Sequence, residues 1–272
     1  MPDAEYLLAL CDRIADAANG AIENIVGTPD ANKTIYMGAD GTPTKLIDDI
    51  SEKAIFNILE DEGISFRILS EEYGEMVIGN DPEYTMIIDP LDGTYNASFG
   101  IPFYSISIAF VRNDINDTYF GYVKNLASGD TFFAQKGKGA FLNGKQLETS
   151  TGTDISKYCI SVYGYRAHVD RAGTLCKNVR RIRILGSVAL ELCYVAAGKL
   201  DAFVDVRESL RLTDIAAGKL IIEEAGGTVT DGNGAGLKLA GSMVNKVYMV
   251  ASNGCSHAKL LKLSKGRAHG SK

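Results

Sequence analysis

An apolar run ends in two closely spaced aspartates in the stretch Ile87-Ile88-Asp89-Pro90-Leu91-Asp92-Gly93-Thr94. The run predicts a buried strand, and Pro90 stiffens the turn that follows it. Gly93 lets the backbone turn sharply and come close to a ligand. Such a turn can aim both carboxylates and the amides of residues 93–95 at one point, which suits a hard cation that bridges to a phosphate. Taken alone, the stretch could also be an ordinary strand-ending turn.

Three other segments place carboxylates where an expected strand or helix begins or ends. Glu71 and Glu72 follow an expected strand. Asp214 stands at the start of an apolar helix, where it could simply be an N-cap. Asp48 and Asp49 stand at the start of another helix, where a solvated face is the alternative. Together these features favour the cation-site interpretation of residues 87–94 over an ordinary turn.

The spacing of apolar residues predicts helices followed by strands in the first half of the chain. Residues 104–111 alternate large and small side chains, which predicts a strand with one large-residue face and one small-residue face. Residues 27–45 are rich in Gly, Thr, Asp and Pro, so we expect a loop or irregular hairpin that serves as a lid. The expected helices cover residues 7–25 and 47–59, and the expected strands cover 66–69, 84–88, 104–111 and a pair within 129–147.

From about residue 155, strands and helices alternate, which is typical of an α/β unit. Ser256 is expected to cap the last helix. The expected strands cover residues 159–163, 182–185, 202–206 and 248–252, and the expected helices cover 187–197, 214–225 and 256–263.

Composition argues against several classes of function. The chain has 272 residues, of which 46% are hydrophobic and 23% charged, and its net charge is −6. This acidic balance disfavours a nucleic-acid partner held by bulk electrostatics. No apolar run approaches the ~18 residues of a membrane span. The N-terminal MPDAEYLLALCDR has neither a basic region nor a cleavage site, so we expect no signal peptide and take the cytoplasm as the default location.

Cysteine and histidine usage points away from a disulfide framework and from a histidine-based site. The five cysteines are widely spaced without a CxxC pair, which predicts buried, reduced thiols. The chain has three histidines, His168, His257 and His269. The last of them lies in the tail, residues 265–272, which we expect to be disordered. Any chemistry is therefore expected to run on carboxylates and hydroxyls.

Four motifs in this order resemble the inositol monophosphatase superfamily, which includes fructose-1,6-bisphosphatases and 3′-phosphoadenosine phosphatases. They are Ser70-Glu71-Glu72, DPLDGT at 89–94, GKGAFLNGKQL at 137–147 and TDIAAGKLIIEEAGG at 213–227. The resemblance spans nearly the whole chain. The superfamily usually has Trp where this chain has Thr213, and the chain contains no tryptophan. That departure resembles the archaeal branch, whose members often accept both inositol monophosphate and fructose 1,6-bisphosphate.

The resemblance implies Mg²⁺ as the cofactor, with two to three ions in each active site. By position, Glu71, Asp89 and the carbonyl of Leu91 match the ligands of a first ion. Asp89, Asp92 and Asp214 match the ligands of a second. These oxygen ligands are of the kind that hard divalent cations prefer.

The resemblance also implies the catalytic residues, which are Asp48, Glu71 and Thr94. Asp48 and Glu71 match a weaker third metal site, and Thr94 with Asp48 matches the pair that orients the attacking water. Water would attack phosphorus in line and without a phosphoenzyme, while metal ions activate it and neutralise the charge of the transferred group.

Substrate contacts are implied at two turns. The first comprises Asp92, Gly93 and Thr94. The second, Gly186-Ser187-Val188-Ala189, resembles the superfamily's G-[TS]-x-A stretch that touches sugar hydroxyls. A plain β–α turn with Ser187 as N-cap is the alternative for this second turn.

Two arginines are implied to hold a second phosphate. Arg183 and Arg207 match arginines of the archaeal branch, and a guanidinium suits a phosphate group. Their alternative is surface ion pairing. Tyr163 and Tyr165 could face the sugar ring, but we expect them in the core.

The implied fold combines α+β and α/β parts in a layered αβαβα sandwich. Residues 1–150 would form an N-terminal α+β part with most metal ligands, and residues 151–264 a C-terminal α/β part with Asp214 and the substrate contacts. The implied activity is Mg²⁺-dependent hydrolysis of inositol 1-phosphate and fructose 1,6-bisphosphate by a homodimer with no nucleic-acid or membrane partner. A 3′-phosphoadenosine phosphatase and a non-catalytic regulatory or binding protein on the same fold are the alternatives.

Overall fold

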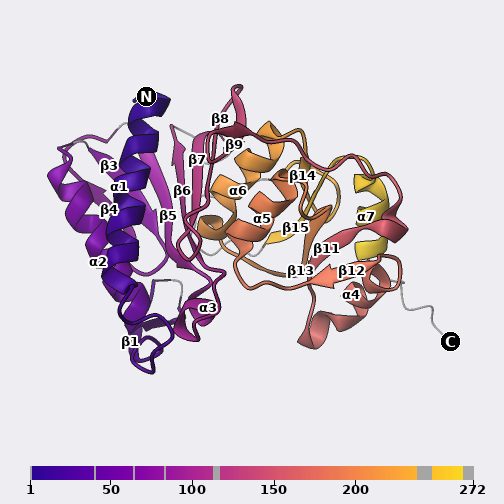
Figure 1. The fold of residues 1–272 in the computed structure, drawn as a ribbon, viewed down its shortest axis with the longest axis horizontal. Helices are drawn as coiled ribbons and strands as arrows, with labels where there is room; N and C mark the ends of the chain where they lie inside the picture. Colours follow the sequence, from indigo (N-terminus) through magenta and orange to yellow (C-terminus); the bar gives the residue numbers. More distant parts are fainter. Residues whose placement is uncertain are drawn as a thin grey trace.

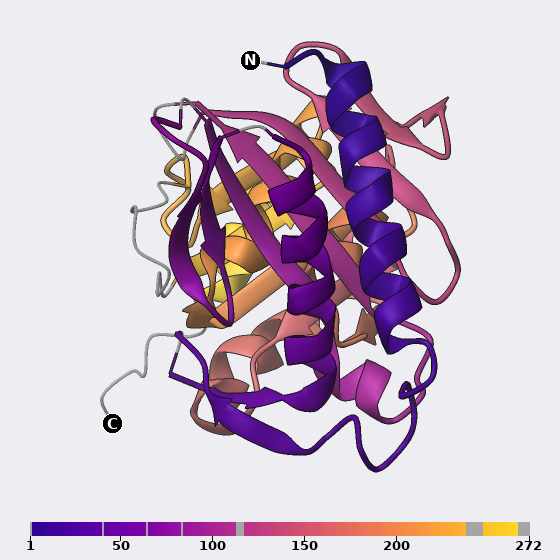
Figure 2. The ribbon, with the colours of Figure 1, turned by 90° about the vertical axis from the view of Figure 1, so that its left-hand side faces the viewer.

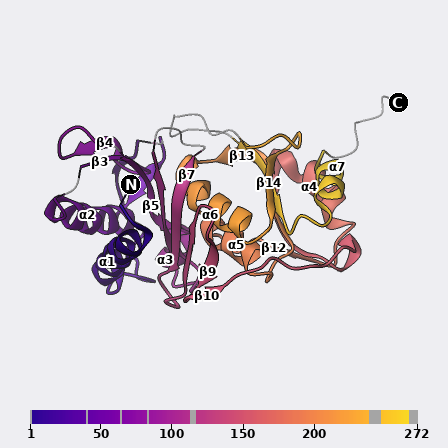
Figure 3. The same ribbon diagram turned by 90° about the horizontal axis from the view of Figure 1, so that it is seen from above.

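Two β-sheets alternate with three layers of helices in the computed structural model (Figure 1). The structure describes residues 2–39, 41–63, 65–82, 84–112, 117–237 and 247–265. Seen from above, the layers follow one another as helices, sheet, helices, sheet, helices (Figure 3). This arrangement confirms the predicted αβαβα sandwich. The expected disorder of the tail concerns residues outside those described, apart from Lys265.

The first sheet has eight strands in the order β10-β9-β8-β7-β6-β5-β3-β4, and only β3 and β5 pair in parallel. β4 and β7 were not anticipated from the sequence. β5 continues through the aspartates with a bulge between Asp89 and Asp92, where a turn was expected. The strands of this first sheet are β3 (Phe66–Ser70), β4 (Gly74–Ile78), β5 (Tyr84–Asp92), β6 (Ser105–Val111), β7 (Thr118–Asn125), β8 (Thr131–Gln135), β9 (Gly139–Leu142) and β10 (Lys145–Gln146).

Helices α1 (Ala4–Ile22) and α2 (Leu46–Asp61) lie side by side across the outer face of this sheet (Figure 2). The Asp3 carboxylate caps α1 by accepting a 2.7 Å hydrogen bond from the Tyr6 amide. Apolar residues recur at helical spacing along α1 and are fully buried against the large-residue face of β6. The helix ends before Ile25, three residues earlier than predicted.

The second sheet has five strands in the order β12-β11-β13-β15-β14. β11 pairs in parallel with both of its neighbours, whereas β15 is antiparallel to β13 and β14, so the sheet is mixed. The strands are β11 (Cys159–Tyr163), β12 (Arg181–Arg183), β13 (Ala202–Leu210), β14 (Thr228–Asp231) and β15 (Val247–Ser252). The predicted division of the chain near residue 150 stays a prediction.

Helices α5 (Val188–Ala196) and α6 (Leu212–Glu224) form the middle layer between the two sheets. Small residues let α6 come close to the first sheet. A Cβ added at Gly121 of β7 would lie 3.0 Å from the Ala217 carbonyl oxygen of α6. Ser107 of β6 donates a 3.3 Å hydrogen bond to the Thr213 carbonyl. The predicted small-residue face of β6 therefore brings the start of α6 against the strand that carries the aspartates.

Helices α4 (Val169–Cys176) and α7 (His257–Ser264) cover the outer face of the second sheet, and short 3₁₀ turns lie at Ile155–Lys157 and Arg166–His168. Ser256 stands at the N-cap of α7, but its hydroxyl donates to the Thr153 carbonyl instead of capping the helix.

Among the described residues, no helix has both the length and the apolarity to cross a bilayer. All five cysteines are free, but Cys255 is exposed, so the expectation that every thiol is buried was wrong.

The lid segment is a hairpin of β1 (Thr34–Met37) and β2 (Pro43–Lys45), followed by α2. Hydrogen bonds hold it to α2 and to the turn between β3 and β4. Tyr36 donates to Asp49 at 3.1 Å, the Ala39 amide donates to the Glu72 carbonyl at 2.9 Å, and the Thr44 hydroxyl donates to the Glu72 carboxylate.

Candidate active site

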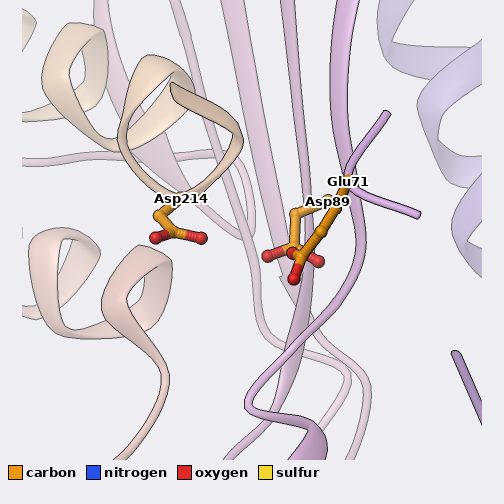
Figure 4. A group of neighbouring side chains, drawn as sticks. All are labelled: Glu71, Asp89 and Asp214. Atoms are coloured by element: carbon orange, nitrogen blue, oxygen red, sulfur yellow. The ribbon is translucent and has the colours of Figure 1, made fainter. Parts of the chain in front are cut away.

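Three carboxylates from three elements meet at one point, as Figure 4 shows for Glu71, Asp89 and Asp214. One oxygen of each lies within 4.8 Å of the others. Because β3 and β5 are parallel neighbours with Ser70 opposite Ile88, Glu71, which directly follows β3, falls beside Asp89 of β5. Asp214 arrives from the first turn of α6. The structure therefore brings together carboxylates that the sequence places up to 143 residues apart (71 to 214).

All three carboxylates are buried, and two of them, Asp89 and Asp214, are incompletely hydrogen-bonded by the described residues. Asp89 Oδ1 accepts a 2.9 Å hydrogen bond from the Leu91 amide, and Asp214 Oδ2 accepts one of 3.0 Å from the Arg211 amide. Their other oxygens, Asp89 Oδ2 and Asp214 Oδ1, are buried and accept no hydrogen bond from the part of the chain that is described. Buried polar atoms without partners are uncommon in folded proteins. Hard carboxylate oxygens converging in this way fit a divalent cation.

The surroundings raise the pKa values of Glu71, Asp89 and the neighbouring Asp92. Burial, and then the charge of Asp89, raises the pKa of Glu71 well above its ordinary value. Burial, and then the charge of Asp92, does the same to the pKa of Asp89. Burial and the charge of Asp214 raise the pKa of Asp92 to about 7. Without a bound cation the cluster therefore resists carrying all its negative charges at once.

Asp48 and Thr94, predicted to act as a pair, are in direct contact. The Thr94 hydroxyl lies 2.9 Å from Asp48 Oδ1 and 3.1 Å from the Leu91 carbonyl oxygen. Burial, and then the charge of Glu72, raises the pKa of Asp48 to about 7. Asp48 and Asp49 are both buried, so the solvated-face alternative for this segment was wrong.

Asp92 joins the two halves of the site. Its Oδ2 accepts 2.7 Å hydrogen bonds from the Ser187 hydroxyl and from the Ala189 amide, at the start of α5. Ser187 is also the N-cap of α5, which confirms that alternative, while its contact with a sugar hydroxyl stays a prediction. Asp92 lies outside the group of three carboxylates that share one point, and its ligation of a metal stays a prediction.

Two glycines allow the turns at residues 93 and 186 to meet. Gly93 has φ +94°, and a Cβ there would lie 3.2 Å from the Gly186 carbonyl oxygen. Gly186 also has φ +94°, and a Cβ there would lie 2.8 Å from the Asn96 side-chain nitrogen. Side chains at either position would be strained and would push the turns apart.

A cavity of about 640 Å³ opens beside the carboxylates. Leu91, Asp92, Gly93, Thr94, Gly186, Val188, Arg207 and Asp214, all predicted site residues, are in its lining. Arg183 is not in that lining. It is exposed, and its guanidinium donates to the Ile182 carbonyl at 2.8 Å. The structure therefore does not bring the two predicted arginines together.

Arg207 is held rigidly at the wall of the cavity. Its guanidinium lies 4.5 Å from the ring centre of Tyr163 and 4.9 Å from that of Tyr165. It also pairs with buried Asp205, with Nε 3.0 Å from Oδ2. This is not the surface ion pair that was the alternative for this residue. Tyr163 is buried as expected, but Tyr165 is 43% exposed and does not belong to the core.

Three residues at the site were not anticipated. Asn96 donates 2.7 Å hydrogen bonds to the Phe103 and Leu185 carbonyls and so ties the two turns together. Buried Glu191 accepts a 2.6 Å hydrogen bond from the Leu185 amide. Arg211 forms ion pairs with Glu71 and Asp214. Its position three residues before Asp214 was the available signal, but pairing with Glu71 depends on tertiary contact.

A larger cavity, of about 760 Å³, lies at the ends of β14 and α7. It adjoins residues outside those described, and Arg171 and Glu208 in its wall form an ion pair of 3.2 Å. Chemistry, and not volume, therefore places the candidate site at the smaller cavity.

Comparison with known proteins gives consistent results. Residues 11–268 match the model of the inositol monophosphatase family. A fructose-1,6-bisphosphatase/inositol-1-monophosphatase from Methanothermobacter thermautotrophicus is 46% identical over 242 residues, which cover 85% of this chain and 86% of that protein. A bifunctional NADP phosphatase/NAD kinase from Methanococcus maripaludis is 40% identical over 275 residues, which cover 94% of this chain but only 48% of that protein.

Solved structures agree with the sequence matches. The crystal structure of an inositol monophosphatase–fructose 1,6-bisphosphatase superposes with a TM-score of 0.85 at 33% identity, over 94% of this chain and 98% of that one. The resemblance drawn from the four motifs is therefore confirmed.

Proposed function

The chain belongs to the inositol monophosphatase family and is a phosphoric monoester hydrolase, and we propose that it acts on inositol 1-phosphate and fructose 1,6-bisphosphate with Mg²⁺. The observation that carries the proposal is the group of three buried carboxylates beside a cavity that also presents Arg207. The cavity thus offers carboxylates that suit a metal-bound phosphate and a guanidinium that suits a second anionic group.

We propose that Glu71, Asp89 and Asp214 hold the metal, with Asp92 and the Leu91 carbonyl as further ligands. Two of these carboxylates keep a buried oxygen that needs a partner. Bound divalent ions would neutralise charge on the transferred phosphoryl group and acidify a water molecule. The number of ions, two to three, is part of the proposal.

Asp48 and Thr94 would position the attacking water. When the Thr94 hydroxyl donates its single proton to Asp48, its lone pairs are left to accept a hydrogen bond from water. This holds the water's oxygen toward phosphorus while Asp48 stands ready to receive the proton. No side-chain nucleophile is required.

Arg207 would bind the second phosphate of fructose 1,6-bisphosphate. Its contacts with Tyr163, Tyr165 and Asp205 fix the guanidinium before the substrate arrives, which reduces the entropy lost on binding. Inositol 1-phosphate has no second phosphate and would depend less on this residue.

A nucleotide 2′- or 3′-phosphate is the second candidate substrate. Tyr95, Tyr165 and Ile184 line the same cavity and are 69%, 43% and 53% exposed. An aromatic and aliphatic rim of this kind suits a nucleoside base. The relative described as an NADP phosphatase/NAD kinase has such a substrate, and a 3′-phosphoadenosine would present similar chemistry.

Phosphate release distinguishes these substrates. We expect release from inositol 1-phosphate and fructose 1,6-bisphosphate with Mg²⁺, and none when EDTA removes the metal. Faster release from NADP or 3′-phosphoadenosine would replace the first candidate with the second. If no phosphate monoester were hydrolysed with Mg²⁺, a binding or regulatory role on the same fold would replace both. We further propose that the protein is a cytoplasmic homodimer. Light scattering after gel filtration would determine its mass.

A further inference from the structure

Arg211 brings a positive charge to the carboxylates that are proposed to hold the metal. It stands at the N-cap of α6, and its Nη1 forms an ion pair with Glu71 Oε1. Its Nε lies 3.4 Å from Asp214 Oδ1. The guanidinium thus contacts two of the three grouped carboxylates, from two different parts of the chain.

The charge of Arg211 acts on more than its two direct partners. It opposes the effect of burial on the pKa of Glu71, Asp89, Asp92 and Asp48, and lowers each of them. Burial and mutual repulsion would otherwise leave this cluster strongly destabilised as anions. One guanidinium therefore compensates a set of four carboxylates when no divalent ion is present.

A divalent ion between Glu71 and Asp214 and the guanidinium in its observed position exclude each other. Mg²⁺ takes its oxygen ligands at about 2.0–2.1 Å, so an ion held by Glu71 and Asp214 would lie close to the guanidinium that pairs with both. Like charges at such short separations repel strongly in a buried site. One of the two cations has to leave.

The side chain of Arg211 has a place to go. Its backbone amide is fixed by the 3.0 Å hydrogen bond to Asp214 Oδ2, which keeps the start of α6 in position. The side chain is 30% exposed and lines the 640 Å³ cavity. Rotation about side-chain bonds would therefore free both carboxylates without moving α6.

We propose that Arg211 is an exchangeable internal counter-ion, which holds Glu71 and Asp214 in the metal-free protein and which a divalent cation must displace into the cavity. This inference rests on the proposed metal site. It predicts that Arg211 weakens metal binding while it stabilises the metal-free fold.

Binding of Mn²⁺ alone, followed by the electron paramagnetic resonance signal of the free ion, tests the proposal on the full chain. Arg211→Gln should bind Mn²⁺ at least about tenfold more tightly than wild type, because no charge has to be displaced. The same variant should unfold at a lower temperature in EDTA and gain more from added Mn²⁺. Equal or weaker Mn²⁺ binding by Arg211→Gln would overturn the inference.

Arg207→Gln is the matched control, since Arg207 lines the same cavity but pairs with Asp205. Its Mn²⁺ affinity should stay within about twofold of wild type, because Arg207 pairs with Asp205 and forms no ion pair with the grouped carboxylates among the described residues. An equal gain in both variants would reduce the effect to general cavity charge and overturn the proposal. If wild type itself bound no Mn²⁺, the proposed metal site would fail, whereas wild-type binding without a gain in Arg211→Gln sinks only the role of Arg211.

A second measurement remains decisive if Arg211→Gln does not fold. In ¹⁵N-labelled wild type, the Nε–H resonance of Arg211, assigned with Arg211→Lys, should shift and lose protection from solvent exchange when Mg²⁺ is added. An unchanged resonance at saturating Mg²⁺ would show that the ion pair persists and would overturn the exchange.

Discussion

Two groups of charged side chains meet at the cavity, and they differ in how far their buried charges are compensated. In the carboxylate group, Glu71, Asp89 and Asp214, two buried oxygens accept no hydrogen bond from the described residues. In the arginine group, Asp205 is matched by Arg207, which is fixed in turn by tyrosine rings. Negative charge that Arg211 compensates only in part marks the place where a divalent cation and chemistry belong. Charge that the protein has already compensated marks a preformed contact for the substrate.

The largest expected effect comes from the carboxylate group. Asp89→Asn keeps the acceptor for the Leu91 amide but removes the charge that faces the other carboxylates. We expect phosphate release to fall at least about a thousandfold, because metal stabilisation of the transferred group is worth several kcal/mol. Phosphate release at saturating Mg²⁺ and a circular dichroism spectrum would check this.

Asp12→Asn is the control for that loss. Asp12 on α1 accepts a 2.7 Å hydrogen bond from Tyr122, away from the cavity. The same isosteric change at Asp12 should leave turnover within about twofold of the wild-type value, because surface substitutions seldom disturb a distant site. A folded Asp89→Asn protein with near wild-type turnover would contradict the assignment of the carboxylate group.

The next effect tests whether a buried carboxyl near the carboxylate group resists ionisation. Glu52 of α2 is fully buried, and its Oε2 accepts no hydrogen bond from the described residues. Burial, and then the charge of Glu72, raises its pKa from 4.5 to about 8 despite a hydrogen bond from Ser70. Because the folded-state pKa is raised, the protonated group's contribution to stability is full below about pH 4.5 and is lost as pH rises through about 8.

Glu52→Gln should therefore match wild type near pH 4.5 and exceed it at pH 9. We expect a gain of about 5 kcal/mol in the free energy of unfolding in EDTA at pH 9. Glu62→Gln should show the opposite sign, since hydrogen bonds from Tyr6 and Arg13 outweigh burial and lower the pKa of Glu62. Denaturant titrations at both pH values measure the two differences, and a gain that does not depend on pH would argue against ionisation of Glu52.

A smaller effect tests the arginine group. Replacing Arg207 with Gln and Asp205 with Asn together removes the charge pair without leaving one partner buried alone. The kcat/KM for fructose 1,6-bisphosphate should fall about 10–100-fold, the worth of a charge-assisted contact, and that for inositol 1-phosphate less than about threefold.

Arg183→Gln provides the contrast, because Arg183 is exposed outside the cavity lining. This variant should change the kcat/KM for each of the two substrates by less than about twofold. If Arg183→Gln selectively impaired the bisphosphate and the double variant did not, the second phosphate would bind elsewhere.

The smallest effect concerns the link between the two groups. Ser187→Ala removes the 2.7 Å hydrogen bond to Asp92 and the N-cap of α5, which should lower the free energy of unfolding by about 1 kcal/mol. Turnover should fall less than about tenfold, since the Ala189 amide still holds Asp92. Ser256→Ala, whose hydroxyl does not cap its helix, should cost less in denaturant titrations. Equal costs would show that the cap and the Asp92 contact add nothing.

Local patterns predicted most of the elements but not all. Apolar spacing located α1, α2 and the strands that carry the aspartates, because those patterns are set by residues close in sequence. These patterns missed β4, β7, β14, α4 and the short helix α3 (Thr94–Ser98), since their identity depends on neighbours that pair or pack with them from elsewhere in the chain. A turn was expected where β5 has its bulge. The strand continues beyond Pro90 because it pairs with β6, a contact that local sequence does not reveal.

The sequence alone determined the family, the sandwich fold and the identity of the acidic residues, because four ordered motifs carry that information at short range. Only the tertiary structure decided which residues meet. It joined Arg211 to Glu71, stacked Arg207 between two tyrosines and left Arg183 outside the cavity. Such pairings follow from how α6 and the two sheets pack, and packing between distant segments is not written in the spacing of any one of them.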